Sequence, residues 1–211
     1  MESVTINKKE RSLNISIILA IASGCCHVAA YVDYYRAARA GKSKPNGATW
    51  AIWSVIALIS VTSYFTATDD IWKNAIPLTN IVLVLIIFAL AVVNGEMKRL
   101  TATDWCSLAI GIIAIGIWKA TTASYANLVV QAAIVIGFIP TYRMVWNDPS
   151  KEAARPWLIW GAGYFLAAIV VILRWHQWLD LVYPINCLIL HPLVPILGRI
   201  SRSRKRALAI A

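Results

Sequence analysis

The chain has 211 residues, of which 59% are hydrophobic and only 14% are charged, and its mean hydropathy is +0.65. In soluble domains about a quarter of the residues are charged, so the composition excludes an ordinary soluble protein. The formal net charge of +10 comes from basic residues that flank apolar segments, a distribution typical of membrane topology. We therefore expect a lipid bilayer, and no nucleic acid, among the partners.

Seven apolar segments without a charged side chain follow one another along the chain. They are residues 12–32, 45–68, 74–95, 105–118, 120–142, 156–173 and 181–198. A helix that spans a membrane needs about 20 such residues. The fourth segment is shorter, but Asp104 and Lys119 at its ends can extend their charged groups to the membrane surface. The sequence predicts an all-α membrane protein with seven transmembrane helices.

The first segment has a second interpretation, as a lipoprotein signal. Lys8, Lys9 and Arg11 precede an apolar run that ends in Ala22-Ser23-Gly24-Cys25, which resembles a cleavage box. Cleavage there would remove most of the first helix and leave the first half of the chain incomplete. We therefore expect this helix to be retained.

The chain repeats itself at an offset of 107 residues. The pattern Tyr-Arg, six residues, Ser-Lys, five residues, Trp-x-Ile-Trp begins at Tyr35 and again at Tyr142, with seven identities and no gap. Chance would give roughly one identity in such a window. The same offset superposes Pro77 on Pro184. Such internal repeats are typical of two-halved membrane transporters, with the site between the halves.

The offset spans four helices, so the first three correspond to the last three and the fourth is unpaired. Three helices alone would invert the second copy, and the extra helix lets both copies face the same way. We predict two parallel three-helix repeats, residues 1–103 and 122–211, joined by a linker helix in residues 104–121 (3+1+3). The second repeat ends in a basic tail.

Seven spans place the two termini on opposite sides of the membrane. Fourteen of the 20 Lys and Arg residues flank the segments on the side of the C-terminus, and six on the side of the N-terminus. Basic residues accumulate on the cytoplasmic side. We predict an external N-terminus, a cytoplasmic C-terminus and a location in the plasma (inner) membrane.

Two motifs resemble those of a known transporter superfamily. Pro140-Thr141-Tyr142-Arg143, with Lys151 after it, resembles the Pro-Gln motif and basic loop of the PQ-loop superfamily, which includes the SWEET (MtN3) sugar transporters. The first repeat has Asp33-Tyr34 there, without Pro or Gln, so the chain is similar to a divergent member. Pro77 to Asn80 and Pro184 to Asn186 resemble the Pro-Asn of SWEET proteins, in which the Asn lines the pocket. The Trp-x-x-Trp pairs and the 3+1+3 plan are also similar to nicotinamide riboside transporters.

The candidate binding residues are aromatic and amide side chains inside the segments. We expect Trp53 and Trp160 to close a central cavity and stack on a flat ring, although simple helix packing is an even alternative. Asn80 and Asn186 are predicted to line that cavity from opposite sides, the alternative being an interhelical hydrogen bond. Gln131 and Tyr164 are further candidates. We interpret Trp50 and Trp157, which open their segments, as part of an interfacial belt.

The ends of the first and fifth segments are candidate gate elements. Tyr35 and Arg36, with Tyr142 and Arg143, are predicted to gate the cytoplasmic side, and Pro140 is predicted to form a hinge because it removes a helix hydrogen bond. The alternative is that these residues only anchor the helices at the membrane surface.

Other chemistry has little support in the sequence. His27 and His191 are candidates for a coupling proton, although packing is the more frequent role of a lone histidine. The four cysteines lack metal-ligand spacing, so we expect no metal, no cofactor and no disulfide. No acidic residue lies within the segments and no GxSxG or HExxH motif occurs. We expect neither a carboxylate-driven pump nor an enzyme, and we predict no catalytic residues.

The function predicted from these features is transport of a small, neutral, polar solute, similar to a sugar or a nucleoside, by alternating access between the repeats. The alternative is a membrane assembly or receptor-like protein that transports nothing. The sequence leaves open whether the chain forms a homo-oligomer.

Overall fold

A computed structural model describes residues 2–97 and 99–210, and the side chains of residues 10–97 and 99–209. Seven long α-helices make up nearly all of this part: α1 (Glu2–Arg39), α2 (Gly47–Thr68), α3 (Ala75–Val93), α4 (Ala102–Ala120), α5 (Ala123–Asn147), α6 (Ala154–Leu173) and α7 (Val182–Ile210). Two short 3-10 helices, η1 (Pro149–Lys151) and η2 (Trp178–Leu181), lie between them. Each long helix is apolar and long enough to cross a membrane. The predicted seven-helix fold is confirmed, and the chain is a multi-pass integral membrane protein. The basic residues Lys8, Lys9 and Lys98 lie outside the described side chains.

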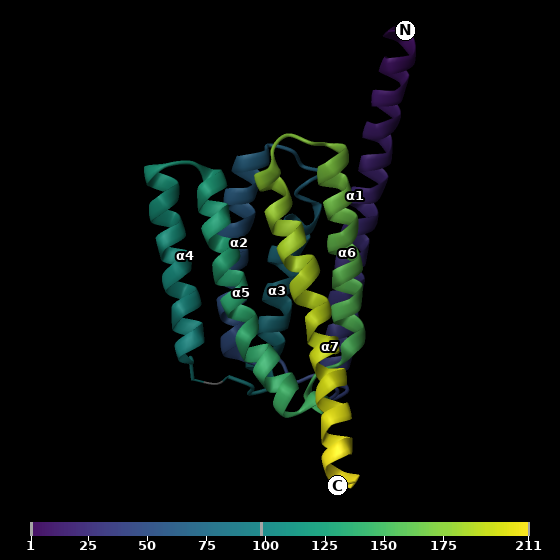
Figure 1. Ribbon diagram of the computed structural model, residues 1–211. Helices are drawn as coiled ribbons and strands as arrows, with labels where there is room; N and C mark the ends of the chain where they lie inside the picture. The colour runs from purple at the N-terminus through teal and green to yellow at the C-terminus, as the bar shows by residue number, and fades with distance from the viewer. Residues whose placement is uncertain (1, 98, 211) are drawn as a thin grey trace.

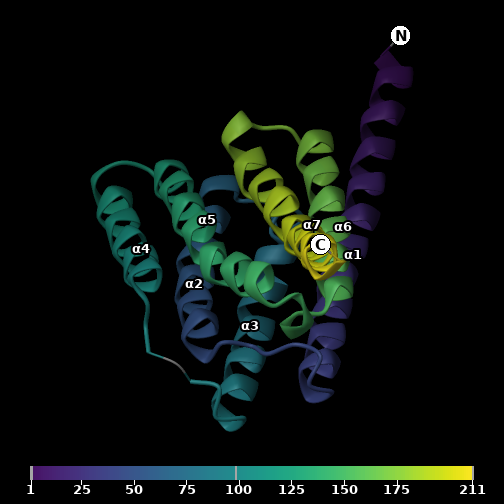
Figure 2. The same ribbon diagram turned by 60° about the horizontal axis from the view of Figure 1, so that its bottom comes forward.

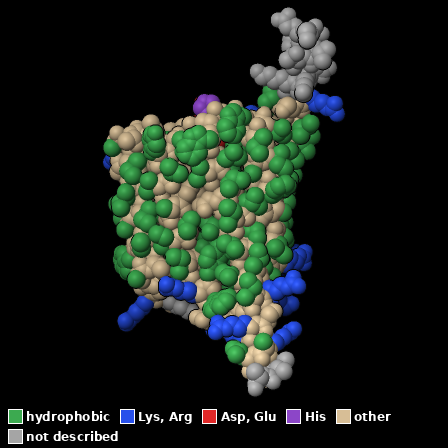
Figure 3. Space-filling view, in the orientation of Figure 1, with side chains coloured by type: hydrophobic (Ala, Val, Ile, Leu, Met, Phe, Trp, Pro, Cys, Tyr) green, Lys and Arg blue, Asp and Glu red, His purple; other side chains and the backbone are tan. Residues whose placement is uncertain are grey.

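Successive helices run in opposite directions, so the two termini lie at opposite ends of the bundle (Figure 1). We call these ends the N-terminal end and the C-terminal end. Figure 3 shows apolar side chains over the visible flank of the bundle and most of the visible Lys and Arg near the C-terminal end. This distribution fits a bilayer around the flank. Which end faces the cytoplasm stays a prediction.

The short fourth segment forms a full helix because of its cap. The Thr101 hydroxyl accepts a hydrogen bond from the Asp104 backbone N–H, and the Asp104 carboxylate accepts one from the Thr101 N–H at 2.7 Å. This reciprocal arrangement satisfies two backbone donors that no helical carbonyl can reach. Asp104 is only 1% exposed. The Asp104 side chain is thus held in the cap at the end of the helix, and its position relative to the membrane surface stays a prediction.

The neighbours of each helix follow the correspondence expected from the repeat. Helix α1 packs against α6 and α3, and its predicted counterpart α5 packs against α2 and α7. The pair α2 and α3 is matched by α6 and α7. Helix α4 lies at one side of the bundle, against α5 and α2 (Figure 2). These contacts agree with a 3+1+3 plan, whose parallel superposition stays a prediction.

Candidate functional site

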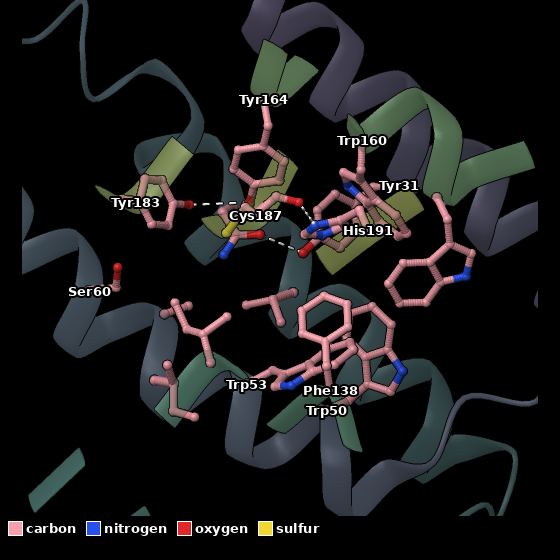
Figure 4. Close-up of a pocket in the computed structure, with 16 residues that line it drawn as sticks. Tyr31, Trp50, Trp53, Ser60, Phe138, Trp160, Tyr164, Tyr183, Cys187 and His191 are labelled. Atoms are coloured by element: carbon pink, nitrogen blue, oxygen red, sulfur yellow. Dashed lines mark hydrogen bonds between the residues drawn. The ribbon is translucent and has the colours of Figure 1, made fainter. Parts of the chain in front are cut away.

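A central cavity lies between α1, α2, α3, α5, α6 and α7. Its volume is about 70 Å³, and Figure 4 shows the side chains around it. Aromatic rings form most of the wall: Tyr31, Trp50, Trp53, Phe138, Trp157, Trp160, Tyr164 and Tyr183. Asn80, Ser60, Cys187 and His191 add polar groups, and no Lys, Arg, Asp or Glu of the described residues lines it. The central cavity is therefore aromatic and without fixed charge.

The rings contact one another mostly edge to face. The ring centroids of Tyr31 and Trp160 are 4.9 Å apart at an interplanar angle of 82°, and those of Trp157 and Trp160 are 5.1 Å apart at 61°. On α2, Trp50 and Trp53 meet at 5.0 Å and 75°. Such pairs contribute about 0.5–1.5 kcal/mol beyond the area that they bury. The rings thus hold one another in position and offer surfaces on which a solute can stack.

Asn80 of α3 lines the central cavity and is within hydrogen-bond distance of two side chains of α1. Its side-chain oxygen accepts a hydrogen bond from the Tyr31 hydroxyl at 2.6 Å and lies 3.1 Å from Nε2 of His27. Because that oxygen can only accept, His27 must carry its proton on Nε2. Among the described residues no hydrogen bond occupies the amide nitrogen of Asn80, which leaves two N–H donors for a solute.

Around the cavity, further polar atoms have no hydrogen-bond partner in the part of the chain that the structure describes. His191 bonds through Nδ1 to the Cys187 carbonyl oxygen at 2.8 Å, so the proton lies on Nδ1 and Nε2 is left as an acceptor. The Trp53 indole N–H and the Ser60 hydroxyl are buried and have no hydrogen-bond partner among the described residues. Unpaired buried polar groups are costly. A solute with hydroxyl groups would satisfy them.

The cavity is contracted relative to the solute that we expect. One water molecule needs roughly 10–15 Å³ of such volume, and a cavity of about 150 Å³ in another protein holds benzene. The 70 Å³ observed here has room for a few water molecules and not for a sugar ring. Helices or rings must therefore move before a sugar or nucleoside can enter.

Four of the six predicted binding residues line the central cavity together, namely Asn80, Trp53, Trp160 and Tyr164. Asn186 and Gln131 do not line it. The Asn186 amide donates to the Gln131 side-chain oxygen at 3.1 Å. Thus Asn80 and Asn186 do not face one cavity from opposite sides.

The helical repeat explains why Asn186 lies outside the lining. Asn80 follows Pro77 by three residues, whereas Asn186 follows Pro184 by two. One residue rotates a side chain by about 100° around a helix, because 3.6 residues make a turn. The position 107 residues after Asn80 is Cys187, which does line the central cavity.

The predicted gate residues lie apart from the central cavity. Tyr35 and Arg36 are exposed on α1, and Arg143 is exposed on α5. The Tyr142 hydroxyl donates to the Leu190 carbonyl at 2.8 Å, and Pro140 lines a second cavity nearer the C-terminal end. The first repeat instead buries the neighbouring Tyr34, at 2% exposure.

The inward face of α1 could have been found from its spacing. His27, Tyr31, Tyr34 and Ala38 are all buried, and they recur at intervals of three and four residues, which is the pattern of one helix face. This pattern selects Tyr34 and excludes Tyr35. The choice of Tyr35 rested only on its identity with Tyr142 across the repeat.

Trp50 and Trp157 belong to the interior. They are 3% and 1% exposed, so their interpretation as an interfacial belt was wrong. Together with Trp53 they line both the central cavity and the second cavity. These three rings therefore form a partition between the two cavities.

The second cavity contains a buried acid that the segment pattern missed. Its volume is about 110 Å³, and Glu152, just after η1, lines it at 7% exposure. The Trp157 indole N–H donates to the Glu152 carboxylate at 3.0 Å. Burial raises the pKa of Glu152 to about 8, although hydrogen bonds with Trp157, Ser43 and Tyr34 oppose the rise. Glu152 belongs to a loop that folds back into the bundle, which apolar runs cannot reveal.

Ion pairs join the two halves at the N-terminal end. Lys73 and Asp180 are 2.7 Å apart, with side chains 2% and 1% exposed, and the Tyr64 hydroxyl donates to the Asp180 carbonyl at 2.8 Å. Arg174 and Asp70 form a second pair at 2.6 Å. Lys73 and Asp180 are separated by the repeat offset of 107 residues. The two loops that correspond in the repeat are thus joined to each other.

The geometry is the evidence on function, since comparisons with protein-family models, with curated proteins and with solved structures found no match.

Proposed function

We propose that this integral membrane protein carries a small, neutral, polar solute across the bilayer by alternating access between its two halves. The central cavity is the observation that supports this most. It lies between the halves, it is aromatic, and its lining includes polar groups that have no hydrogen-bond partner among the described residues. Pockets for small molecules combine apolar walls with a few well-placed polar groups in the same way.

The absence of fixed charge in the described lining favours a neutral solute. A buried charge without a partner is strongly destabilised, so an ionic solute would need a counter-charge in the wall. Tryptophan and tyrosine rings can stack on a sugar or a nucleobase. The Asn80 amide, His191 Nε2 and the Ser60 hydroxyl can bond to its hydroxyl groups.

Alternating access is supported by contacts that join the two halves at both ends of the bundle. The Lys73–Asp180 pair joins the halves at the N-terminal end. At the C-terminal end the Lys44 N–H donates to the Lys151 carbonyl at 2.9 Å. Such ties between halves can open at one end while the other stays closed. We further propose that the chain is a divergent, SWEET-like member of the PQ-loop superfamily, as its helix neighbours and motifs suggest.

Uptake into proteoliposomes tests this proposal. The parent protein and two variants are screened with a panel of labelled sugars and nucleosides. Trp160→Ala removes a buried ring of the cavity, whereas Trp105→Ala removes a ring of α4 that is 61% exposed. We expect uptake of at least one solute, a loss of about tenfold or more in Trp160→Ala, since deleting a central aromatic contact costs over 1.4 kcal/mol, and no change in Trp105→Ala. Absence of uptake across the panel by the folded parent, or equal losses in both variants, would overturn the proposal.

A further inference from the structure

Glu152 is a buried carboxyl group that forms no ion pair with any of the described residues. It is 7% exposed, and the contact that fixes it is the Trp157 indole N–H at 3.0 Å. Among the described residues, no Lys, Arg or His lies within ion-pair distance of it. A charged carboxylate there would lack both water and a counter-charge.

The charged and titratable groups around Glu152 are few. Tyr34 faces the second cavity from α1, and Lys44 faces it from the loop between α1 and α2. On its own segment, Lys151 pairs with Asp148 at 3.5 Å. At the start of α6, Arg155 pairs with Asp33 of α1 at 3.6 Å, and from α7 Arg202 donates to the Pro149 carbonyl at 3.5 Å. From α5 the lining is Pro140, Thr141 and Met144, and α2 adds Thr49 and two tryptophans, none of which titrates. Burial raises the pKa of Glu152 to about 8. The residues around Glu152 therefore favour the protonated, uncharged form of its carboxyl group.

The lining of the second cavity also includes a hydroxyl group that could bind a water molecule. The Thr49 hydroxyl lies in its wall, is 4% exposed as a residue and has no hydrogen-bond partner among the described residues. The 110 Å³ of the cavity has room for several water molecules, at roughly 10–15 Å³ each. Water that enters here would reach both Thr49 and the carboxyl group of Glu152.

Glu152 lies where the two halves meet at the C-terminal end. The residue before it, Lys151, accepts the Lys44 N–H at 2.9 Å. The residue after it, Ala153, donates its N–H to the Ser43 hydroxyl at 3.0 Å. These bonds join residues 41–46 to residues 148–153, which correspond at the repeat offset. A change in the charge of Glu152 therefore acts directly on this closure.

We infer that Glu152 is a proton-binding site that controls the C-terminal end of the protein. With the proton bound, the neutral carboxyl stays among Trp157, Tyr34 and Ser43, and the two loops remain joined. When the proton leaves to water, the carboxylate draws water into the second cavity and separates the loops. The Trp50, Trp53 and Trp157 partition is then the remaining barrier to the central cavity. Given the proposed function, release of solute at this end depends on pH.

Cys187 provides a reporter that needs no solute. Its side chain lines the central cavity and is 2% exposed. The other three cysteines, Cys25, Cys26 and Cys106, are replaced by Ala, and reaction of Cys187 with a small water-soluble methanethiosulfonate is timed from about pH 6 to about pH 9.5. Thiolate is the reactive form of cysteine, so rates rise with pH in every variant. The informative quantity is the ratio of the parent rate to that of Glu152→Gln, which mimics the neutral acid.

We expect this ratio to be close to one at about pH 6 and to rise about fivefold or more above the pKa of about 8. Asp148→Asn, which neutralises an exposed carboxylate of the same segment, should behave as the parent does. A ratio that stays flat with pH, or a rise that disappears in Asp148→Asn, would overturn the inference.

A second measurement uses the parent protein alone, so it tests the inference even if Glu152→Gln does not fold. The infrared carbonyl band of a protonated carboxyl group should be present in the parent at about pH 7 and fade around pH 8. Its absence at about pH 7 would also overturn the inference. Both measurements stand without any solute, so a negative uptake screen contradicts the proposed function alone.

Discussion

Single side chains decide what the central cavity can hold. Asn80 turns an amide towards the cavity because its oxygen is held by Tyr31 at 2.6 Å and its neighbour His27 at 3.1 Å. Asn186, the other half's amide, is held by Gln131 instead. The two asparagines therefore have different roles, although both follow a proline near the start of the third helix of a half.

This difference gives a prediction for two matched variants. Asn80→Ala should lower uptake of the solute by about tenfold, because it removes a donor from the site. Asn186→Ala should leave uptake within about twofold and change thermal stability only slightly, since hydrogen bonds between membrane helices average about 0.6 kcal/mol. Initial uptake rates and melting temperatures of both variants in detergent check this. Equal loss of uptake in both would show that Asn186 also serves the site.

The sequence identifies candidate binding residues more readily than it predicts which of their side chains face the central cavity. Trp53, Trp160, Asn80 and Tyr164 were predicted as lining residues from their position in apolar segments, and the structure brings them together. The repeat offset, applied strictly, would have replaced Asn186 by Cys187. Glu152 could not be found in this way, because its burial depends on how one loop packs against a distant loop.

At the scale of the helices, close approach depends on small residues at particular places. A Cβ atom at Gly137 of α5 would lie 2.8 Å from the Trp53 indole nitrogen on α2. The absence of a side chain there lets α5 support the partition ring. Gly116 of α4, in contrast, has nothing within 4 Å of its Cβ position.

The two glycines therefore predict opposite outcomes for the same substitution. Gly137→Ala should displace Trp53, shift the intrinsic tryptophan emission and reduce uptake. Gly116→Ala should leave both unchanged and slightly stabilise the protein, because alanine is favoured over glycine within a helix by roughly 0.5–1 kcal/mol. Emission spectra and melting curves of the two variants test these two predictions. An unchanged spectrum in Gly137→Ala would mean that the ring adjusts without moving the partition.

The apolar segments predicted the seven helices, whereas the residues at which the helices begin and end depend on local hydrogen bonds such as caps. The seven uncharged segments each became a helix because a bilayer requires satisfied backbone groups over about 20 residues. The fourth helix begins earlier than its segment because Thr101 and Asp104 form a capping box. Helix α1 extends beyond its segment at both ends, since Glu10 to Arg39 forms one apolar span despite its charged ends.

In the whole molecule, the two halves are joined at both ends of the bundle around a cavity of about 70 Å³. The buried Lys73–Asp180 pair and the partly exposed Arg174–Asp70 pair join the halves at the N-terminal end, and hydrogen bonds between the loops beside Glu152 join them at the C-terminal end. Breaking a buried pair by removing one partner costs several kcal/mol, so opening of the N-terminal end requires compensation from water or from a bound solute. Under the proposed function, this structure lies between a state that is open at the N-terminal end and one that is open at the C-terminal end.

Solute counterflow measures whether the two halves carry a solute by alternating access. Proteoliposomes are loaded with excess unlabelled solute, chosen from the uptake screen, and a trace of labelled solute is added outside. A carrier exchanges one for the other, so the label should rise transiently above its equilibrium level in the parent and should not do so in Trp160→Ala. Monotonic equilibration without any overshoot, or the same overshoot in Trp160→Ala, would contradict the account.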